Sequence, residues 1–203
     1  MAFNVQEFRS QLTGDGARPN LFQCTLNFPN SVATGGTGIY GLTAKAAFMC
    51  RAAQLPGSTV NQIPVNYFGR ELKFSGNRTF PEWTVTIIND EDFLLRDAFE
   101  RWMSSLNSHI SNLRDSNFVQ ASDYQVDGYV TQYGKAGTPN AGPALTAEGG
   151  IKQYKFVGMF PIDVSPIELD WGSNDTIEEY AVTFAYQWWE SNTTEPVYNG
   201  SNA

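Results

Sequence analysis

The sequence predicts a mainly β fold: an antiparallel β-sandwich or barrel with one flanking α-helix at about residues 90–108 and a short N-terminal helix. Several segments alternate apolar and polar residues, which is typical of strands with one buried face, and only one long segment has the helical period. With 203 residues, 41% of them hydrophobic, the chain is long enough to bury its own core. We expect one domain over residues 1–203, with flexible loops at 29–43 and 134–150 and a polar tail at 191–203; two very small domains are the alternative.

The first predicted element is a short helix near the N-terminus. Asn4 and Glu7 have the spacing of a capping box, in which each side chain accepts a backbone hydrogen bond near the other residue. Val5, Phe8 and Leu12 then fall on one face of the helix. This pattern predicts a helix with an apolar stripe.

Four segments alternate apolar and polar residues, and three others carry a weaker strand signal. The four are residues 22–28, 83–87, 154–162 and 176–189, and the three are residues 47–52, 67–74 and 124–133. Turns are predicted at residues 76–77 (GN) and 170–172 (DWG). The segment 176–189 would span about 46 Å at ~3.3 Å per residue, which is more than twice the usual length of a strand.

Residues 54–65 contain Pro56 and Pro64, which exclude a helix and a central strand. The segment still carries several large apolar side chains, namely Leu55, Val60, Ile63 and Val65. An extended apolar segment with prolines suits a sheet edge or a projecting arm. Either it packs on its own domain or it docks on a neighbouring molecule.

The long helix is predicted at about residues 90–108. Asn89 or Asp90 caps its start, and the carboxylates of residues 90–92 complement the positive end of the helix dipole. Its apolar positions recur at spacings of four, three and four, which places them on one stripe. They are Leu95, Phe99, Trp102 and Leu106.

The charge is distributed unevenly along the chain. The net charge is −8, from 13 basic and 21 acidic residues. All basic residues lie at or before Lys155, and eight acidic residues follow it. Such an acidic surface repels phosphate backbones, which disfavours nucleic-acid recognition. The alternative is an acidic face that only aids solubility.

Residues that usually carry catalysis or metal binding are sparse. His109, the single histidine, stands at the end of the predicted long helix, where a cation complements the dipole. Cys24 and Cys50 lack metal-ligand spacing and are expected to be buried, inert thiols. No phosphate-binding loop, dinucleotide fingerprint or nucleophile elbow occurs. We therefore expect no catalytic residues, no metal and no cofactor, although scattered carboxylates such as Asp123 and Asp127 leave a carboxylate-pair hydrolase open.

Three blocks of the sequence, in this order and spacing, resemble a known family. They are residues 16–23 (GARPNLFQ), then residues 78–80 (RTF), 83–86 (WTVT) and 89–91 (NDE), and then residues 158–190 with LDW at 169–171, SN at 173–174, Tyr186 and WE at 189–190. This set resembles the tail tube protein of contractile-tailed bacteriophages of the T-even type. The segment 54–65 also fits, and the resemblance covers about two-thirds of the chain. Residues 29–43, 134–150 and 191–203 depart from the pattern.

The resemblance implies a structural protein and not an enzyme. In this family six copies form a ring, and rings stack into a hollow tube inside a contractile sheath. The implied partners are copies of the chain itself, the tail sheath protein, the tape-measure protein, and the baseplate and tail terminator proteins. DNA would pass through the bore without specific binding. The implied location is the virion tail, assembled in the bacterial host cytoplasm, and no membrane-spanning segment is expected.

The resemblance and the proline-bearing segment together predict where copies of the chain meet. The expected inter-ring or inter-subunit contacts are Leu55, Val60, Ile63, Val65, Tyr67 and Phe68. Close variants of this function are a ring that initiates the tube at the baseplate, or the tube of a phage-derived secretion or injection system. A different class of function is a monomeric ligand-binding β-sandwich, with Trp188 and Trp189 as a stacking platform.

Overall fold

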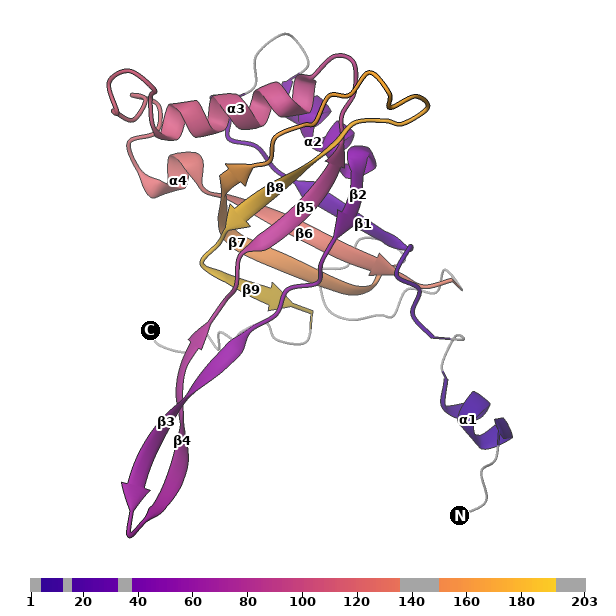
Figure 1. The fold of residues 1–203 in the computed structure, drawn as a ribbon, viewed down its shortest axis with the longest axis vertical. Helices are drawn as coiled ribbons and strands as arrows, with labels where there is room; N and C mark the ends of the chain where they lie inside the picture. The colour runs from indigo at the N-terminus through magenta and orange to yellow at the C-terminus, as the bar shows by residue number, and fades with distance from the viewer. Residues whose placement is uncertain (1–4, 13–15, 33–37, 136–149, 193–203) are drawn as a thin grey trace, which may run out of the picture.

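Two β units make up the fold, a seven-stranded antiparallel sheet and a separate two-stranded hairpin (Figure 1). We describe them from a computed structural model, which covers residues 5–12, 16–32, 38–135 and 150–192. The sheet contains β1 (Phe22–Leu26), β2 (Cys50–Ala53), β5 (Trp83–Ile88), β6 (Val126–Tyr133), β7 (Gly150–Val164), β8 (Glu179–Ala185) and β9 (Trp188–Ser191). The hairpin contains β3 (Thr59–Tyr67) and β4 (Arg70–Thr79), and the helices are α1 (Val5–Gln11), α2 (Gly38–Met49), α3 (Leu94–Leu106) and α4 (Ala121–Tyr124). The predicted mainly β, antiparallel fold with few helices is confirmed.

β7 joins the two halves of the large sheet. The strand order is β1-β6-β7-β8-β5-β2, and β9 also pairs with β7. The first part of β7 pairs with β6 and β9, and its last part, from Phe160, pairs with β8. Between them Gly158 has a φ of 65°, and a Cβ there would lie 3.0 Å from Gln187 Cγ, so only glycine fits easily. The prediction of one continuous strand over 176–189 is therefore wrong, because β8 and β9 are separate strands on either side of this bend.

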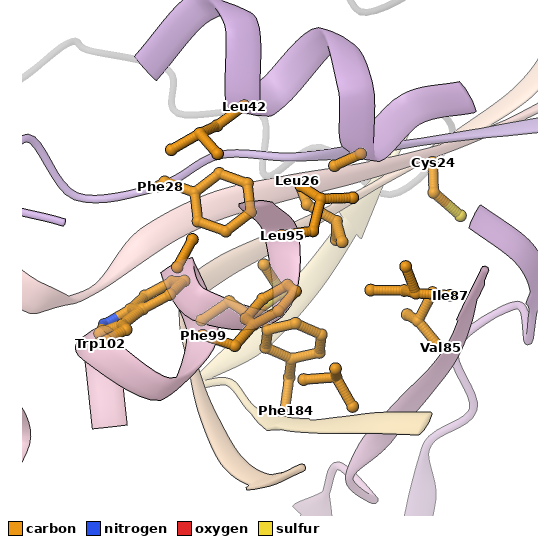
Figure 2. Packing of buried hydrophobic residues seen from close by; sticks show 14 of the residues in the cluster. Cys24, Leu26, Phe28, Leu42, Val85, Ile87, Leu95, Phe99, Trp102 and Phe184 are labelled. Carbon is orange, nitrogen blue, oxygen red and sulfur yellow. The ribbon is translucent and has the colours of Figure 1, made fainter. Parts of the chain in front are cut away.

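The hydrophobic core lies between the sheet and α3 (Figure 2). The buried residues of α3 are Leu95, Ala98, Phe99 and Trp102. The Phe99 ring lies 5.2 Å from Phe28 and 5.9 Å from Phe184, measured between ring centroids. Burying a large apolar side chain contributes about 1.5–3 kcal/mol, so this stripe holds α3 on the sheet. The predicted apolar stripe is confirmed, with Leu106 only partly buried at its end.

The structure corrects both ends of the predicted long helix. Phe93 has a left-handed φ of 51°, so Asn89 and Asp90 lie outside the helix and do not cap it. Instead the Asp92 carboxylate accepts a hydrogen bond from the Leu94 N–H at 3.0 Å. At its other end α3 stops two residues earlier than predicted.

α2 corrects the predicted flexible loop at 29–43 and the predicted strand at 47–52. Residues 38–43 belong to α2, and β2 begins only where α2 ends. Leu42 and Ala46 of this helix are buried against the core. Their burial outweighs the weak helix preference of a segment that contains glycine and threonine, which is why the sequence pattern misses the helix.

Some predictions fall partly on residues outside the described part of the chain. These residues are 1–4, 13–15, 33–37, 136–149 and 193–203. They include the predicted cap Asn4, most of the predicted loop 134–150 and most of the predicted tail 191–203. At the described margins, Gly150 belongs to β7 and Ser191 is buried in β9, so these two residues are not part of a loop or a tail.

α1 confirms the predicted short N-terminal helix. Its side chains are exposed, including the apolar Val5 and Phe8, and Figure 1 places it away from the sheet. The predicted apolar stripe of this helix therefore contacts no part of the core. Of the helices within the described ranges, none has both the length and the apolar character that crossing a membrane requires.

Candidate assembly surface

The β3–β4 hairpin projects from the body of the molecule (Figure 1). Its two strands are joined at Phe68 and Gly69, which have φ values of 47° and 78°. Positive φ at both residues of a two-residue turn matches the right-handed twist of the flanking strands. The predicted strand 67–74 is confirmed from Arg70 onward, but the turn at Phe68 and Gly69 interrupts its start. The predicted turn at residues 76–77 is wrong, because β4 continues through Gly76.

Gly76 is needed for strand pairing and not for a turn. A Cβ at this position would lie 2.9 Å from the Asn61 carbonyl oxygen. The pairing register shifts here, between Val60 and Gln62, as in a β-bulge. The glycine thus permits the two backbones to approach closely at the bulge.

The hairpin has one apolar face and one polar face. Directly opposite residues of an antiparallel pair lie on the same side of the sheet, and Ile63 pairs with Phe74 while Val65 pairs with Leu72. With Tyr67, these residues form what we call the apolar hairpin face: Ile63, Val65, Tyr67, Leu72 and Phe74. The alternate residues are polar apart from Pro64, namely Gln62, Asn66, Glu71, Lys73 and Ser75.

Nothing in the described part of the chain covers the apolar hairpin face. Every residue of β3 is exposed, and Gly76 is the only residue of β4 that is not. Exposed fractions on this face range from 44% at Leu72 to 63% at Tyr67, and Phe68 at the turn is 92% exposed. A two-stranded hairpin is marginally stable alone in water, and contiguous exposed apolar surface marks an interaction site. The interpretation that this segment packs on its own domain is excluded.

The predicted contact residues divide between the hairpin and its base. Val60, Ile63, Val65 and Tyr67 lie in β3 and Phe68 in the turn, whereas Leu55 lies in the connection before β3 and is 47% exposed. Leu72 and Phe74 are not among the predicted contact residues, although the predicted strand 67–74 contains them. The structure brings them onto the same face as the predicted residues.

Two tryptophans hold the base of the hairpin on the sheet. Trp83 of β5 donates its indole N–H to the Gln54 carbonyl at 2.8 Å, and Trp189 of β9 donates to the Gly57 carbonyl at 2.9 Å. The Arg78 guanidinium lies 5.7 Å from the centroid of the Trp189 ring. The base of the hairpin is therefore hydrogen-bonded both to β5, which is paired on both sides, and to β9, which is paired only with β7.

Comparison with known proteins places these features in a family. A family model described as "Phage tail tube protein" matches residues 17–192. The tail tube protein gp19 of Enterobacteria phage T4 is 32% identical over 178 residues, covering 88% of this chain and 93% of that protein. The chain belongs to the phage tail tube protein family. It is a structural component of the virion tail tube and not an enzyme.

The chain also resembles a more distant tail tube protein in sequence and two solved structures in fold. The tail tube protein of Serratia phage KSP90 is 23% identical over 185 residues, covering 90% of this chain and 93% of that protein. A chain of the anti-feeding prophage tube-terminating cap matches with a TM-score of 0.55 at 14% identity, covering 94% of this chain and 93% of that chain. A chain of the PVC extracellular contractile injection system sheath–tube complex matches with a TM-score of 0.52 at 13% identity, covering 94% and 98%. The tail tube fold thus recurs in contractile injection systems.

The reactive groups of this tail tube chain are placed for structure. The Cys24 thiol is buried, and its hydrogen bond with Cys50 together with burial raises its pKa, which keeps it protonated and inert. His109 is exposed just after α3. Within the described residues, no group of three or more His, Cys, Asp or Glu side chains is arranged to hold a metal ion.

Trp188 and Trp189 do not form a shared stacking platform. Trp189 packs against the core, with its ring 5.5 Å from the Tyr154 ring, while Trp188 is 44% exposed and donates its indole N–H to Glu190. Adjacent residues of a strand point to opposite faces, which separates the two rings. This removes the basis for the monomeric ligand-binding alternative.

Proposed function

We propose that this chain is the repeating protomer of the tube: six copies form a ring, rings stack into a hollow tube inside the contractile sheath, and the β3–β4 hairpin docks on the neighbouring ring. The observation that carries this proposal is the exposed apolar hairpin face. Exposure of its large apolar side chains to water is unfavourable, and their burial against a partner is favourable.

A head-to-tail contact between two copies of the chain explains how the hairpin of one copy can have another copy as its partner. A contact between two different surfaces of the same protein either closes into a ring or continues without limit. If each protomer docks through a hairpin at one of its ends, the other end of the outermost ring stays free. A further ring can dock there. The same chain can therefore build a tube of any length.

The further partners are those of a tail tube. The outer surface would contact the sheath protein, as fits the fold match to a chain of a sheath–tube complex. The tape-measure protein would occupy the bore during growth, the baseplate would start the tube, and a terminator would close it. In the role of a baseplate initiator, one face of the ring would instead meet a different protein. The support for that alternative is fold alone, a TM-score of 0.53 at 12% identity to a chain of the anti-feeding prophage baseplate.

DNA is proposed to pass through the bore without specific binding. Duplex DNA carries about one charge per 1.7 Å and would adhere to a basic wall. The chain has a net charge of −8, and no basic residue follows Lys155. A neutral or acidic wall would leave the duplex free to slide.

The test is to place charges on the apolar hairpin face. Ile63→Asp with Val65→Asp should leave a folded protomer that forms no tubes at the wild-type concentration. Each carboxylate buried without a partner would cost at least about 1.4 kcal/mol, so the assembly concentration should rise more than about tenfold. Electron microscopy and sedimentation measure assembly, and circular dichroism measures folding.

The matched control puts the same two charges on the opposite face of the hairpin. Gln62→Asp with Asn66→Asp should assemble much closer to the wild type, since these side chains lie on the polar face. If the Ile63→Asp, Val65→Asp variant forms tubes of normal length at the wild-type concentration, the hairpin is not the stacking element.

A further inference from the structure

The connection between β7 and β8, residues 165–178, lies at the end of the long axis opposite to the β3–β4 hairpin (Figure 1). Three of its large apolar side chains face solvent: Leu169 is 79% exposed, Ile177 is 71% exposed and Trp171 is fully exposed. Exposure of this size in one short segment is typical of an interaction site. The two ends of the molecule thus both present uncovered apolar side chains.

The 165–178 connection borders a hollow that is open to solvent. A cavity of about 590 Å³ is lined by this segment and the start of β8, with Ile167, Leu169, Trp171 and Ile177 as its large apolar walls. Ligand pockets are typically about 300–1,000 Å³, so the hollow is large enough for an aromatic side chain such as Phe68.

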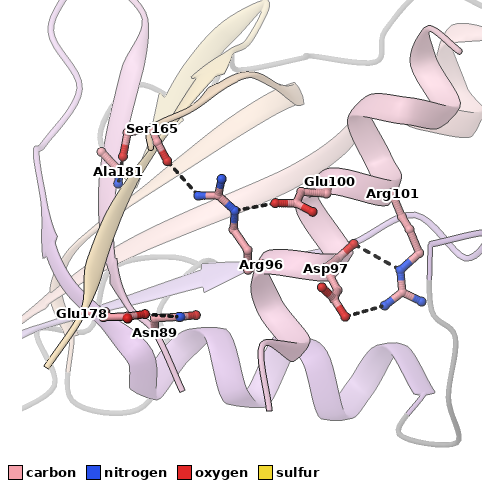
Figure 3. A network of polar contacts seen from close by, with 8 residues as sticks. All are labelled: Asn89, Arg96, Asp97, Glu100, Arg101, Ser165, Glu178 and Ala181. Carbon is pink, nitrogen blue, oxygen red and sulfur yellow. Dashed lines mark hydrogen bonds and ion pairs between the residues drawn. The ribbon is translucent and has the colours of Figure 1, made fainter. Parts of the chain in front are cut away.

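The base of this connection is firmly held (Figure 3). Arg96 of α3 donates to the Ser165 carbonyl at 2.7 Å, and the Ala181 N–H donates to the Ser165 hydroxyl at 2.8 Å. At its other end Asn89 donates to the Glu178 carboxylate at 2.9 Å. A surface held in place before binding loses little conformational freedom when a partner docks.

The charges of the two ends are complementary. The 165–178 connection and the first residue of β8 carry five carboxylates and no basic residue: Glu168, Asp170, Asp175, Glu178 and Glu179. Among the described residues, neither Glu168 nor Asp175 takes part in an ion pair. The hairpin carries three basic residues and one acidic residue: Arg70, Lys73, Arg78 and Glu71. Opposite charges across an interface favour correct docking and fix its register.

We propose that residues 165–178 are the acceptor for the hairpin of a second copy of this chain, in the next ring. The hollow takes the turn at Phe68, and the exposed carboxylates face Arg70, which lies opposite Tyr67 on the apolar hairpin face. This inference rests on the proposed stacking function and names the surface that the hairpin meets. Because donor and acceptor lie at opposite ends of one chain, each docked copy presents a new free end of the same kind.

Site-directed cross-linking distinguishes this surface from others. Asn66→Cys next to the hairpin turn and Asn174→Cys in the acceptor replace exposed neutral side chains, so the apolar and charged groups stay intact. Both are combined with Cys50→Ala to remove the half-buried native thiol. Assembled tubes treated with a flexible bis-maleimide should give a denaturing-gel ladder that continues beyond six chains. Either single-cysteine variant should give dimers at most.

The outcomes separate this inference from the proposed function. If the double variant forms tubes without cross-links, or with a ladder that stops at six chains, the acceptor lies elsewhere and the stacking function stands. If the wild-type protein never forms rings or tubes, both are overturned. A charge exchange gives an independent measurement: Arg70→Glu and Glu168→Arg should each raise the assembly concentration several-fold at low salt, and together should restore it. Folded single variants that weaken assembly without restoration in the pair would overturn the acceptor.

Discussion

At the scale of single residues, Lys45 links two helices that are distant in the sequence. Its ammonium contacts both Asp90, at 2.8 Å, and Asp92, which precede α3, while Lys45 itself belongs to α2. Burial lowers the pKa of Lys45, but the hydrogen bonds to Asp90 and Asp92 outweigh it and raise the pKa above 10.5. The hydrogen bond from Lys45, followed by that from the Leu94 N–H, lowers the pKa of Asp92 below 3.8.

These shifts predict a pH window for the stability supplied by Lys45. A lowered pKa on Asp92 means that its contribution is present above pH 3.8 and is lost as the pH falls through the lower, folded-state value. A raised pKa on Lys45 means that its contribution persists below pH 10.5 and is lost as the pH rises through the higher, folded-state value. We expect Lys45→Met to lower the free energy of unfolding by about 0.5–1 kcal/mol at pH 7, measured by urea unfolding, with the difference shrinking below pH 3.8.

Lys73→Met is the matched control for this prediction. Its ammonium lies 4.0 Å from Glu71 on the exposed hairpin, where a pair contributes little. The control should change stability by only a few tenths of a kcal/mol. A Lys45→Met deficit that is equal at pH 7 and at pH 2 would show that lost packing, and not the ion pairs, explains the effect.

At the scale of elements, the hairpin and the sheet differ in how far their apolar side chains are buried. The apolar side chains of β3 and β4 are exposed, whereas Phe156 of β7 and Phe184 of β8 are buried and contact the Trp83 ring. Local opening is easiest where few apolar contacts would be broken. The hairpin is therefore the element whose stability depends most on assembly.

Hydrogen exchange should report this dependence directly. In the isolated protomer, backbone amides of β3 and β4 should exchange at least about tenfold faster than those of β7 and β8. In assembled tubes the hairpin amides should become strongly protected, because the docked ring covers them. Peptides from β7 and β8 serve as the internal reference and should change little. Equal hairpin protection in protomer and tube would contradict docking of this element.

The sequence predicts elements well where one local rule decides and poorly where tertiary contacts decide. The stripe at Leu95, Phe99 and Trp102 is predictable because helical spacing directly gives its buried face. The segment 54–65 is predicted as a sheet edge or a projecting arm because Pro56 and Pro64 exclude a helix and a central strand, but its pairing with residues 70–79 in a hairpin is not predicted. α2 is missed because its helix is stabilised by burial of residues such as Leu42 and not by its composition. The break between β8 and β9 is missed because its cause, the bend at Gly158, lies in another strand.

At the scale of the whole molecule, the charge separates along the chain and between the two ends. No basic residue follows Lys155, and the acidic end of the molecule lies opposite the hairpin with its basic residues. The contact residues of such an assembly are hard to predict from sequence, because the alternation that places Leu72 and Phe74 in a strand does not say which face a partner covers. The acceptor requires the arrangement of both ends in space.

Assembled tubes should not retain duplex DNA. At about 0.15 M salt charges act over only ~8 Å, and an acidic or neutral bore offers no phosphate contacts within that range. We expect no co-sedimentation of short duplex DNA with tubes. The salt dependence is the control: lowering the salt strengthens repulsion here, whereas it strengthens binding for a basic wall. Retention that increases as salt is lowered would contradict a bore without phosphate contacts.

The attachment of the hairpin has a mechanical consequence. The indole N–H groups of Trp83 and Trp189 hold its base on β5 and β9, and both strands are bonded to further strands, β5 to β2 and β8 and β9 to β7. A pull on a docked hairpin would therefore load the two ladders of β5 and the single ladder between β9 and β7 at the same time. A tube that is driven endwise against a barrier needs attachments that share the load, because an attachment whose hydrogen bonds break one after another fails at low force.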